Sequence, residues 1–170
     1  MGNTTKDLDI VIVGAGFAGM YALHHFRGLG YDTKIVEAAS GVGGTWYWNR
    51  YPGARVDIES MEYSYSFSEE LAQEWKLSER YSAQPELLAY ANHVADRFDL
   101  RRDILFNTSV KSAVFDEKTD KWTVTTDSGE IRAKYCIMAT GILSAANLPD
   151  FPGMQLFKGP KYHTARWPKE

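Results

Sequence analysis

The sequence has 170 residues, a formal net charge of −3 at pH 7 and an apolar fraction of 44%. That length suffices for one domain with a proper hydrophobic core. The weakly acidic balance argues against nucleic acid or an anionic membrane surface as a partner. No apolar run is long enough to span a bilayer and no signal-peptide pattern opens the chain, so we expect a cytoplasmic protein that does not associate with membranes.

The N-terminal stretch predicts a strand, a glycine turn, a helix and a second strand. Residues 9–13 are almost all apolar and mostly β-branched, which is typical of a strand buried on both faces. Apolar residues then recur at helical spacing until Gly28 and Gly30 end the helix. Residues 33–37 form another short strand. This order is typical of an α/β domain with a parallel sheet.

Three glycines in the turn indicate a dinucleotide site. Gly14 permits a tight turn, Gly16 lets the backbone approach a pyrophosphate, and Gly19 lets the helix pack closely on the strand. The first turn of the following helix offers free N–H groups and a partial positive charge to phosphates. Glu37 lies where a carboxylate accepts hydrogen bonds from ribose hydroxyls and repels a 2′-phosphate, which favours FAD or NAD over NADP. The alternative is a glycine-rich turn that serves packing only.

The loop over residues 38–57 is long for a compact domain and indicates function. Gly41, Gly43 and Gly44 argue against a stable helix here and let the backbone reach a ligand. Trp46 and Trp48 are suited to enclosing a flat ring system. The alternative is a structural Ω-loop.

The remaining chain predicts a helical insertion, an antiparallel meander and a returning parallel strand. His93, in the helix predicted over residues 85–98, is interpreted as a surface or hydrogen-bonded histidine rather than a metal ligand, and we predict no metal site. The predicted helices cover residues 69–75 and 85–98, and the predicted strands cover residues 104–106, 110–115, 121–126, 130–133 and 135–139. The last strand closes with Thr140 and Gly141, and this order resembles the FAD domain of flavoproteins with two dinucleotide domains.

Three separated motifs make the resemblance specific. Residues 157–168 match the pattern FxGxxxHxxxWP, the signature of type I Baeyer–Villiger monooxygenases. Residues 43–55, with Asp57 close behind, and residues 58–67 look like the same family. The similarity covers essentially the whole chain and is strongest to the phenylacetone and steroid monooxygenase branch, alongside cyclohexanone monooxygenases. It implies a Rossmann-like FAD-binding domain over residues 1–150, with the helical insertion at about 58–103.

The resemblance also implies roles for individual residues. Arg55, Val56 and Asp57 fall between the flavin ring and the bound nicotinamide, and Arg55 and Asp57 are the candidate catalytic residues. For Asp57 the alternative is a turn-capping aspartate. The predicted cofactor-binding residues are Gly14, Gly16, Phe17, Ala18, Gly19, Glu37, Gly44, Thr45, Trp46, Tyr47, Trp48, Val56, Asp57, Tyr63, Val110, Ala139, Thr140 and Gly141.

Residues 151–170 resemble the linker that leads to the NADPH domain of the family. Its motif residues are Phe157, Gly159, His163 and Trp167. The resemblance implies that His163 couples domain motion to turnover and is not a general base. A lone histidine at this spacing would otherwise be read as structural.

The implied chemistry is the FAD- and NADPH-dependent conversion of a ketone to an ester or lactone, with oxygen carried as a flavin peroxide. The family has a second GxGxxG for NADPH, an activating arginine and a segment that completes the FAD domain, and none of these lies within the sequence. We therefore expect an incomplete FAD domain that turns over only with the C-terminal half, from a second polypeptide or a longer parent. The alternatives are a stand-alone binder of FAD or another adenine dinucleotide, and an N-hydroxylating or other flavin monooxygenase.

Overall fold

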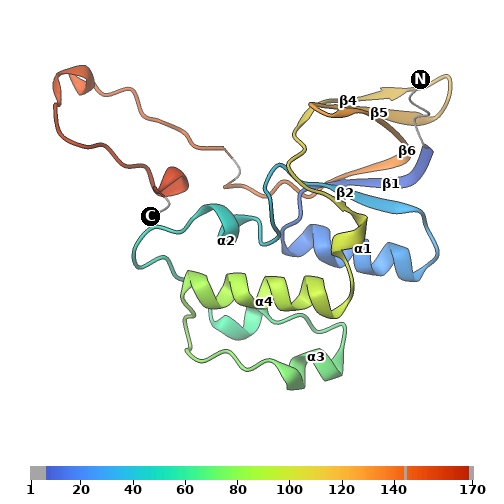
Figure 1. The fold of residues 1–170 in the computed structure, drawn as a ribbon, viewed down its shortest axis with the longest axis horizontal. Coiled ribbons are helices and arrows are strands. Elements are labelled where there is room, and N and C mark those ends of the chain that lie inside the picture. Colours follow the sequence, from blue (N-terminus) through green and yellow to red (C-terminus); the bar gives the residue numbers. More distant parts are fainter. Residues whose placement is uncertain (1–6, 144, 169–170) are drawn as a thin grey trace.

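A computed structural model describes residues 7–143 and 145–168 and contains a mixed six-stranded sheet with helices on one side (Figure 1). Residues 1–6 of the predicted FAD-binding domain (1–150) and residues 169–170 of the predicted linker (151–170) lie outside the described residues. The strands are β1 (Asp7–Val13), β2 (Thr33–Val36), β3 (Ile104–Leu105), β4 (Val110–Asp116), β5 (Lys121–Thr126) and β6 (Gly129–Met138). The α-helices are α1 (Phe17–Gly28), α2 (Thr45–Trp48), α3 (Glu69–Glu74) and α4 (Gln84–Arg97), and short 3₁₀ turns cover Ser60–Tyr63, Arg101–Asp103, Met154–Leu156 and Thr164–Arg166.

The sheet order is β3-β2-β1-β6-β5-β4, with β1 at the centre of the parallel part. β1 pairs in parallel with β2 on one side and with β6 on the other, and β2 pairs in parallel with β3. β4, β5 and β6 pair antiparallel. The predicted fold class is confirmed: an α/β domain with a parallel core, an antiparallel meander and a helical insertion.

One strand prediction was wrong. The third meander strand and the returning parallel strand are not two elements, because β6 runs unbroken for 10 residues. Its first half pairs with β5, where Ala133 lies opposite Trp122, and its whole length from Arg132 onward pairs with β1. Ala133 is completely buried and pairs with both Leu8 of β1 and Trp122 of β5, so these two partners hold the chain extended where a break was predicted. A single strand therefore joins the meander to the parallel sheet.

The expectation that the loop after β2 holds no helix was also wrong, over one turn. Gly43 and Gly44 adopt φ angles of 118° and 54°, which L-residues rarely adopt. Both precede the four-residue helix α2 rather than lying within it. The two glycines therefore form a sharp turn, and the helical turn α2 begins directly after it.

The core has two layers, one on each face of the sheet. On one face, Ile10 and Ile12 of β1 pack against Met20 and Leu23 of α1, and α4 adds its buried alanines to the same cluster. On the other face, Val11 packs with side chains of the meander, which curls over the parallel strands (Figure 1). α1 and the glycine turn are thus held between the sheet and the insertion.

An ionic cluster ties α1 and β2 to the start of β3. Asp103 accepts hydrogen bonds from Lys34 Nζ at 2.8 Å and from Arg27 Nη1 at 3.1 Å. Burial acts to raise the pKa of Asp103, but these two basic groups outweigh it and lower that pKa below its ordinary value of 3.8. The charged form of Asp103 therefore stabilises the fold.

The chain after β6 leaves the sheet and projects from it as an extended loop that turns back toward α2 (Figure 1). Many of its apolar side chains are exposed, including Ile142, Leu148, Phe151, Leu156, Phe157 and Tyr162. Such a series of exposed apolar side chains is uncommon on a monomer. Within residues 7–143 and 145–168, no helix is long and apolar enough to cross a membrane.

Candidate functional site

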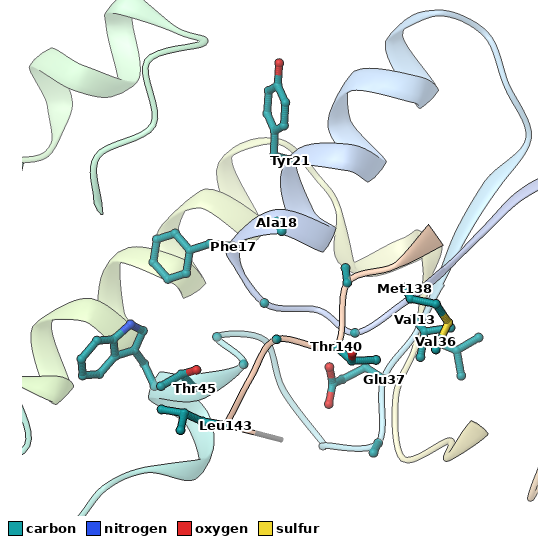
Figure 2. A pocket seen from close by; sticks show the side chains of 18 of the residues that line it. Val13, Phe17, Ala18, Tyr21, Val36, Glu37, Thr45, Met138, Thr140 and Leu143 are labelled. Atoms are coloured by element: carbon teal, nitrogen blue, oxygen red, sulfur yellow. The ribbon is translucent and has the colours of Figure 1, made fainter. Parts of the chain in front are cut away.

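A large groove opens at the carboxyl ends of β1, β2 and β6, where ligands of open parallel sheets bind. Its volume is about 1290 Å³, beyond the usual range for small-molecule pockets of about 300–1,000 Å³. Figure 2 shows the start of α1 with Phe17 and Ala18 above this space and Glu37 on its opposite side. The volume of the groove is therefore sufficient for a large ligand.

The first and third glycines of the turn are required by packing. Gly14 has a φ of 105°, and a Cβ at this position would lie 2.6 Å from the carbonyl oxygen of Ala139 at the end of β6. A Cβ on Gly19 would lie 1.9 Å from the carbonyl oxygen of Gly14. The roles predicted for these two glycines, in the tight turn and in close helix packing, agree with this geometry.

The second glycine lies against another glycine. A Cβ on Gly44 would meet the Cα of Gly16 at 2.9 Å, and Gly43 N donates to the carbonyl of Ala15 at 3.0 Å. Backbone alone thus forms this side of the groove. α1 begins directly beyond it, with neither a side-chain cap at Gly16 nor an acidic residue in its first turn. The first N–H groups of α1 and its positive end are left for an anion.

Glu37 is 6% exposed and lines the groove. Its Oε2 accepts from Ala15 N at 2.6 Å and its Oε1 from Ala39 N at 2.7 Å. Sequence reasoning predicted the ribose role and missed these two bonds. Because an ionised carboxylate has about four acceptor sites, both bonds leave room for ribose hydroxyls. Glu37 therefore joins the glycine turn to the following loop as well as facing the ligand space.

Aromatic side chains close the other end of the groove. Trp46 is buried and meets the ring of Tyr63 edge-on at 5.6 Å, while its carbonyl accepts from Gln84 Nε2 at 2.5 Å. Trp48 is 43% exposed and also lines the groove. Burial, aided by the charge of Asp57, raises the pKa of the Tyr63 hydroxyl, which stays protonated at neutral pH. This end offers neutral, flat surfaces.

Most of the predicted cofactor residues come together around this one groove. Those that line it are Gly14, Gly16, Phe17, Ala18, Glu37, Gly44, Thr45, Trp46, Trp48, Tyr63, Val110, Ala139, Thr140 and Gly141. Gly19 supports the turn from behind. The ring of Tyr47 is directed at Gly41 and Ser40, whose hydroxyl lies 2.7 Å from the Tyr47 hydroxyl. Tyr47 is therefore placed beside the loop rather than among the lining residues.

The candidate catalytic residues lie outside the lining of the groove. Arg55 donates to Glu79 Oε2 at 2.5 Å and to the carbonyl of Tyr81 at 2.8 Å. Val56 is buried, and Asp57 is exposed close enough to Tyr63 to affect its pKa. Their place between flavin and nicotinamide stays a prediction.

His163 contacts both the linker and the segment that precedes it. Its Nδ1 accepts from Ala165 N at 3.1 Å, and its Nε2 lies 3.2 Å from the carbonyl oxygen of Asn147. Trp167 packs on Tyr162 with ring centroids 5.2 Å apart. The bond from Ala165 to His163 caps the 3₁₀ turn at Thr164–Arg166. The coupling of His163 to domain motion stays a prediction.

Several groove residues were missed by sequence reasoning. They include Val36, Tyr65, Phe67, Thr108, Ser109, Lys111 and Met138. A usable signal existed for Thr108 and Ser109, because they come shortly after the predicted strand at residues 104–106 and ligands bind beyond the carboxyl ends of parallel strands. The alternation of Tyr63, Tyr65 and Phe67 was another, since these rings sit on one side of the chain.

Comparison with known proteins is consistent with this geometry. The sequence pattern of the family described as "Pyridine nucleotide-disulphide oxidoreductase" matches residues 11–169. The chain is 49% identical over 168 residues to an acetone monooxygenase (methyl acetate-forming) of Gordonia sp. (strain TY-5), covering 98% of this chain and 32% of that protein. It is 46% identical over 170 residues to the phenazine N-monooxygenase PhzNO1 of Lysobacter antibioticus, covering 99% and 31%.

Solved structures have the same fold. An oxidised steroid monooxygenase bound to NADP superposes with a TM-score of 0.89 and 61% identity, over 96% of this chain and 32% of that one. A cyclohexanone monooxygenase from Rhodococcus sp. Phi1 bound to NADP+ gives 0.91 and 47%, over 98% and 32%. The chain thus spans about a third of the length of the relatives that it matches.

Proposed function

The chain belongs to the pyridine nucleotide-disulphide oxidoreductase family and, within it, matches the N-terminal FAD-binding part of type I Baeyer–Villiger monooxygenases, and we propose that its groove holds FAD. The proposed reaction of the complete enzyme is the NADPH-dependent insertion of oxygen into a ketone, giving an ester or lactone. A relative of similar sequence is named for forming methyl acetate from acetone, which supports this reaction type.

The observation that carries the proposal is the side-chain-free floor at Gly16 and Gly44, next to the open start of α1. A diphosphate needs close approach of backbone N–H groups and a positive field, and both are present there. Glu37 lies on the same groove, in the position that suits adenosine ribose. The aromatic end at Trp46, Trp48 and Tyr63 suits a flavin ring.

FAD, when bound, supplies a ring that accepts reducing equivalents from NADPH and reacts with oxygen. The residues of this chain bind and orient it: the first turn of α1 fixes the pyrophosphate, and the tryptophan loop shields one side of the ring from water. Asp57 is the proposed partner of the activating arginine, and Arg55 and Val56 border the nicotinamide. The proposed linker residues, with His163 among them, transmit the movement of an NADPH domain.

The proposed substrates are a small ketone and O₂, and the proposed partner is the C-terminal part of such an enzyme. The exposed apolar side chains after β6 support a missing partner surface. We further propose that the 170-residue chain alone does not turn over, and that it acts in the cytoplasm.

FAD titration of the protein tests the binding proposal, with flavin fluorescence as the readout. The unaltered chain is expected to bind FAD. Gly16→Trp is expected to lose binding, because the indole would fill the space before the first turn of α1. Gly28→Trp is the matched control, since an added Cβ there meets nothing within 4 Å. Equal FAD binding by both variants would refute the placement.

Reconstitution tests the reaction. NADPH oxidation and ester formation from a ketone are measured with the chain alone and after addition of the C-terminal half of a relative. Ester only in the mixture is the expected result. FAD binding without ester in either sample would favour the stand-alone dinucleotide binder.

A second candidate is N-oxygenation. The 46% identity to a phenazine N-monooxygenase favours keeping it, because this stretch of sequence occurs in enzymes of both kinds. The same reconstituted mixture distinguishes the two when it is offered a phenazine in place of the ketone, and only N-oxide formation would support this candidate.

A further inference from the structure

An aromatic side chain of the insertion holds the first turn of α1 from outside the dinucleotide fingerprint. The Tyr65 hydroxyl donates to the carbonyl oxygen of Phe17, the first residue of α1, at 2.5 Å. The two rings also pack, with centroids 5.4 Å apart. Tyr65 is among the residues that line the groove. A residue 48 positions along the chain is thus bonded directly to the turn that faces the ligand.

Tyr65 is itself fixed by α4. Its backbone N–H donates to the hydroxyl of Tyr90 at 2.9 Å, and Tyr90 is 1% exposed. The rings of Tyr65 and Tyr90 lie 6.1 Å apart, and that of Phe17 lies 6.1 Å from Tyr90. The path from α4 through Tyr90 and Tyr65 to Phe17 therefore consists of two partly buried hydrogen bonds and the packing of three rings.

We propose that Tyr65 is a positioning residue for the diphosphate of the cofactor: its hydroxyl holds the carbonyl of Phe17 and so aims the free N–H groups of the first turn of α1 into the groove. This inference rests on the proposed function and deepens it. It gives a role to a residue that lies outside the glycine turn and that was not among the predicted cofactor-binding residues. The insertion would thereby serve nucleotide binding as well as packing.

The charge state of Tyr65 suits this role. Burial strongly raises the pKa of its hydroxyl, with Tyr90 contributing in the same direction. The side chain therefore stays a neutral donor at neutral pH and adds no negative charge beside a diphosphate. Loss of the hydroxyl alone should leave the ring contacts in place while freeing the carbonyl of Phe17.

The test is Tyr65→Phe, read by the affinities for ADP and for adenosine. ADP contains the diphosphate and adenosine lacks it, so the ratio of the two dissociation constants isolates the contribution of the first turn. Tyr65→Phe is expected to weaken ADP binding by roughly threefold to tenfold, as for one lost hydrogen bond, and to leave adenosine binding unchanged. Tyr31→Phe, at a half-exposed tyrosine outside the groove lining, is the matched control and should change neither affinity.

A merely structural role for Tyr65 predicts a different outcome. Equal weakening of ADP and adenosine, or unchanged ADP binding, would overturn the inference. Tyr90→Phe provides a second variant: it keeps the Tyr65 hydroxyl but removes its support, and a smaller loss confined to ADP is expected. No binding of ADP or FAD by the unaltered protein would overturn the proposed function and this inference with it, whereas normal binding by Tyr65→Phe overturns the inference alone.

Discussion

Glu37→Gln is expected both to destabilise the empty protein and to weaken FAD binding. The two carboxylate oxygens accept from buried backbone N–H groups, Ala15 at 2.6 Å and Ala39 at 2.7 Å. Glutamine has one acceptor oxygen, so its amide NH₂ would face one of these N–H groups. A hydrogen bond to a charged group contributes roughly 1.5–3 kcal/mol, and an unsatisfied buried donor costs roughly 1–3 kcal/mol, so we expect a loss of about 2–4 kcal/mol.

For a chain of this length, about 1 kcal/mol shifts the melting temperature by roughly 2–4 °C, so Glu37→Gln should melt several degrees lower. The assay is thermal unfolding without ligand, followed by FAD titration. Glu130→Gln, at an exposed position in β6, is the control and should behave as the unaltered protein. If Glu37→Gln melted at the unaltered temperature, the two backbone bonds would not hold the turn. If it also bound FAD normally, the ribose role would fall too.

Three further predictions concern other parts of the chain. Gly19→Ala should lower the free energy of unfolding by about 3 kcal/mol or more, because its Cβ would overlap the carbonyl of Gly14. Gly28→Ala, where the space is open, should leave that free energy unchanged or raise it by about 0.5–1 kcal/mol. Similar melting temperatures for the two variants would contradict this packing. Asp103→Asn should lower stability at pH 7. Because the pKa of Asp103 is lowered in the folded protein, its stabilisation is fully present above pH 3.8 and is lost as the pH falls through the folded-state pKa. The difference in free energy of unfolding between the unaltered protein and Asp103→Asn should therefore shrink in acid. A difference that does not change with pH would argue against the ionic cluster. Trp48→Phe should reduce the quenching of tryptophan fluorescence by bound FAD, and undiminished quenching would remove Trp48 from the flavin end.

The strand–turn–helix–strand unit was predictable because local signals agree there. Apolar runs, glycines that tolerate unusual φ angles and a helical period all occur within residues 9–37. The insertion helices were predicted within a residue or two of α3 and α4 for the same reason. These features depend on near neighbours in the chain, which a sequence displays directly.

Long-range pairing limited the other predictions. The local sequence at Lys134 and Tyr135 does not distinguish one continuous strand from two, and β6 was predicted as two strands. Its continuity follows from its pairing with β1 and β5. The bonds from Glu37 to Ala15 and Ala39 depend on how the turn meets the next loop. The hydrogen bond from Tyr65 to Phe17 links residues far apart in sequence, so spacing rules do not reveal it.

A crystal structure of the protein soaked with FAD would test the central claim most directly. The diphosphate should lie within hydrogen-bonding distance of the first N–H groups of α1, at Phe17 and Ala18, with a ribose hydroxyl on Glu37 and the flavin ring toward Trp46. FAD held elsewhere on the molecule, with the floor at Gly16 untouched, would contradict the claim.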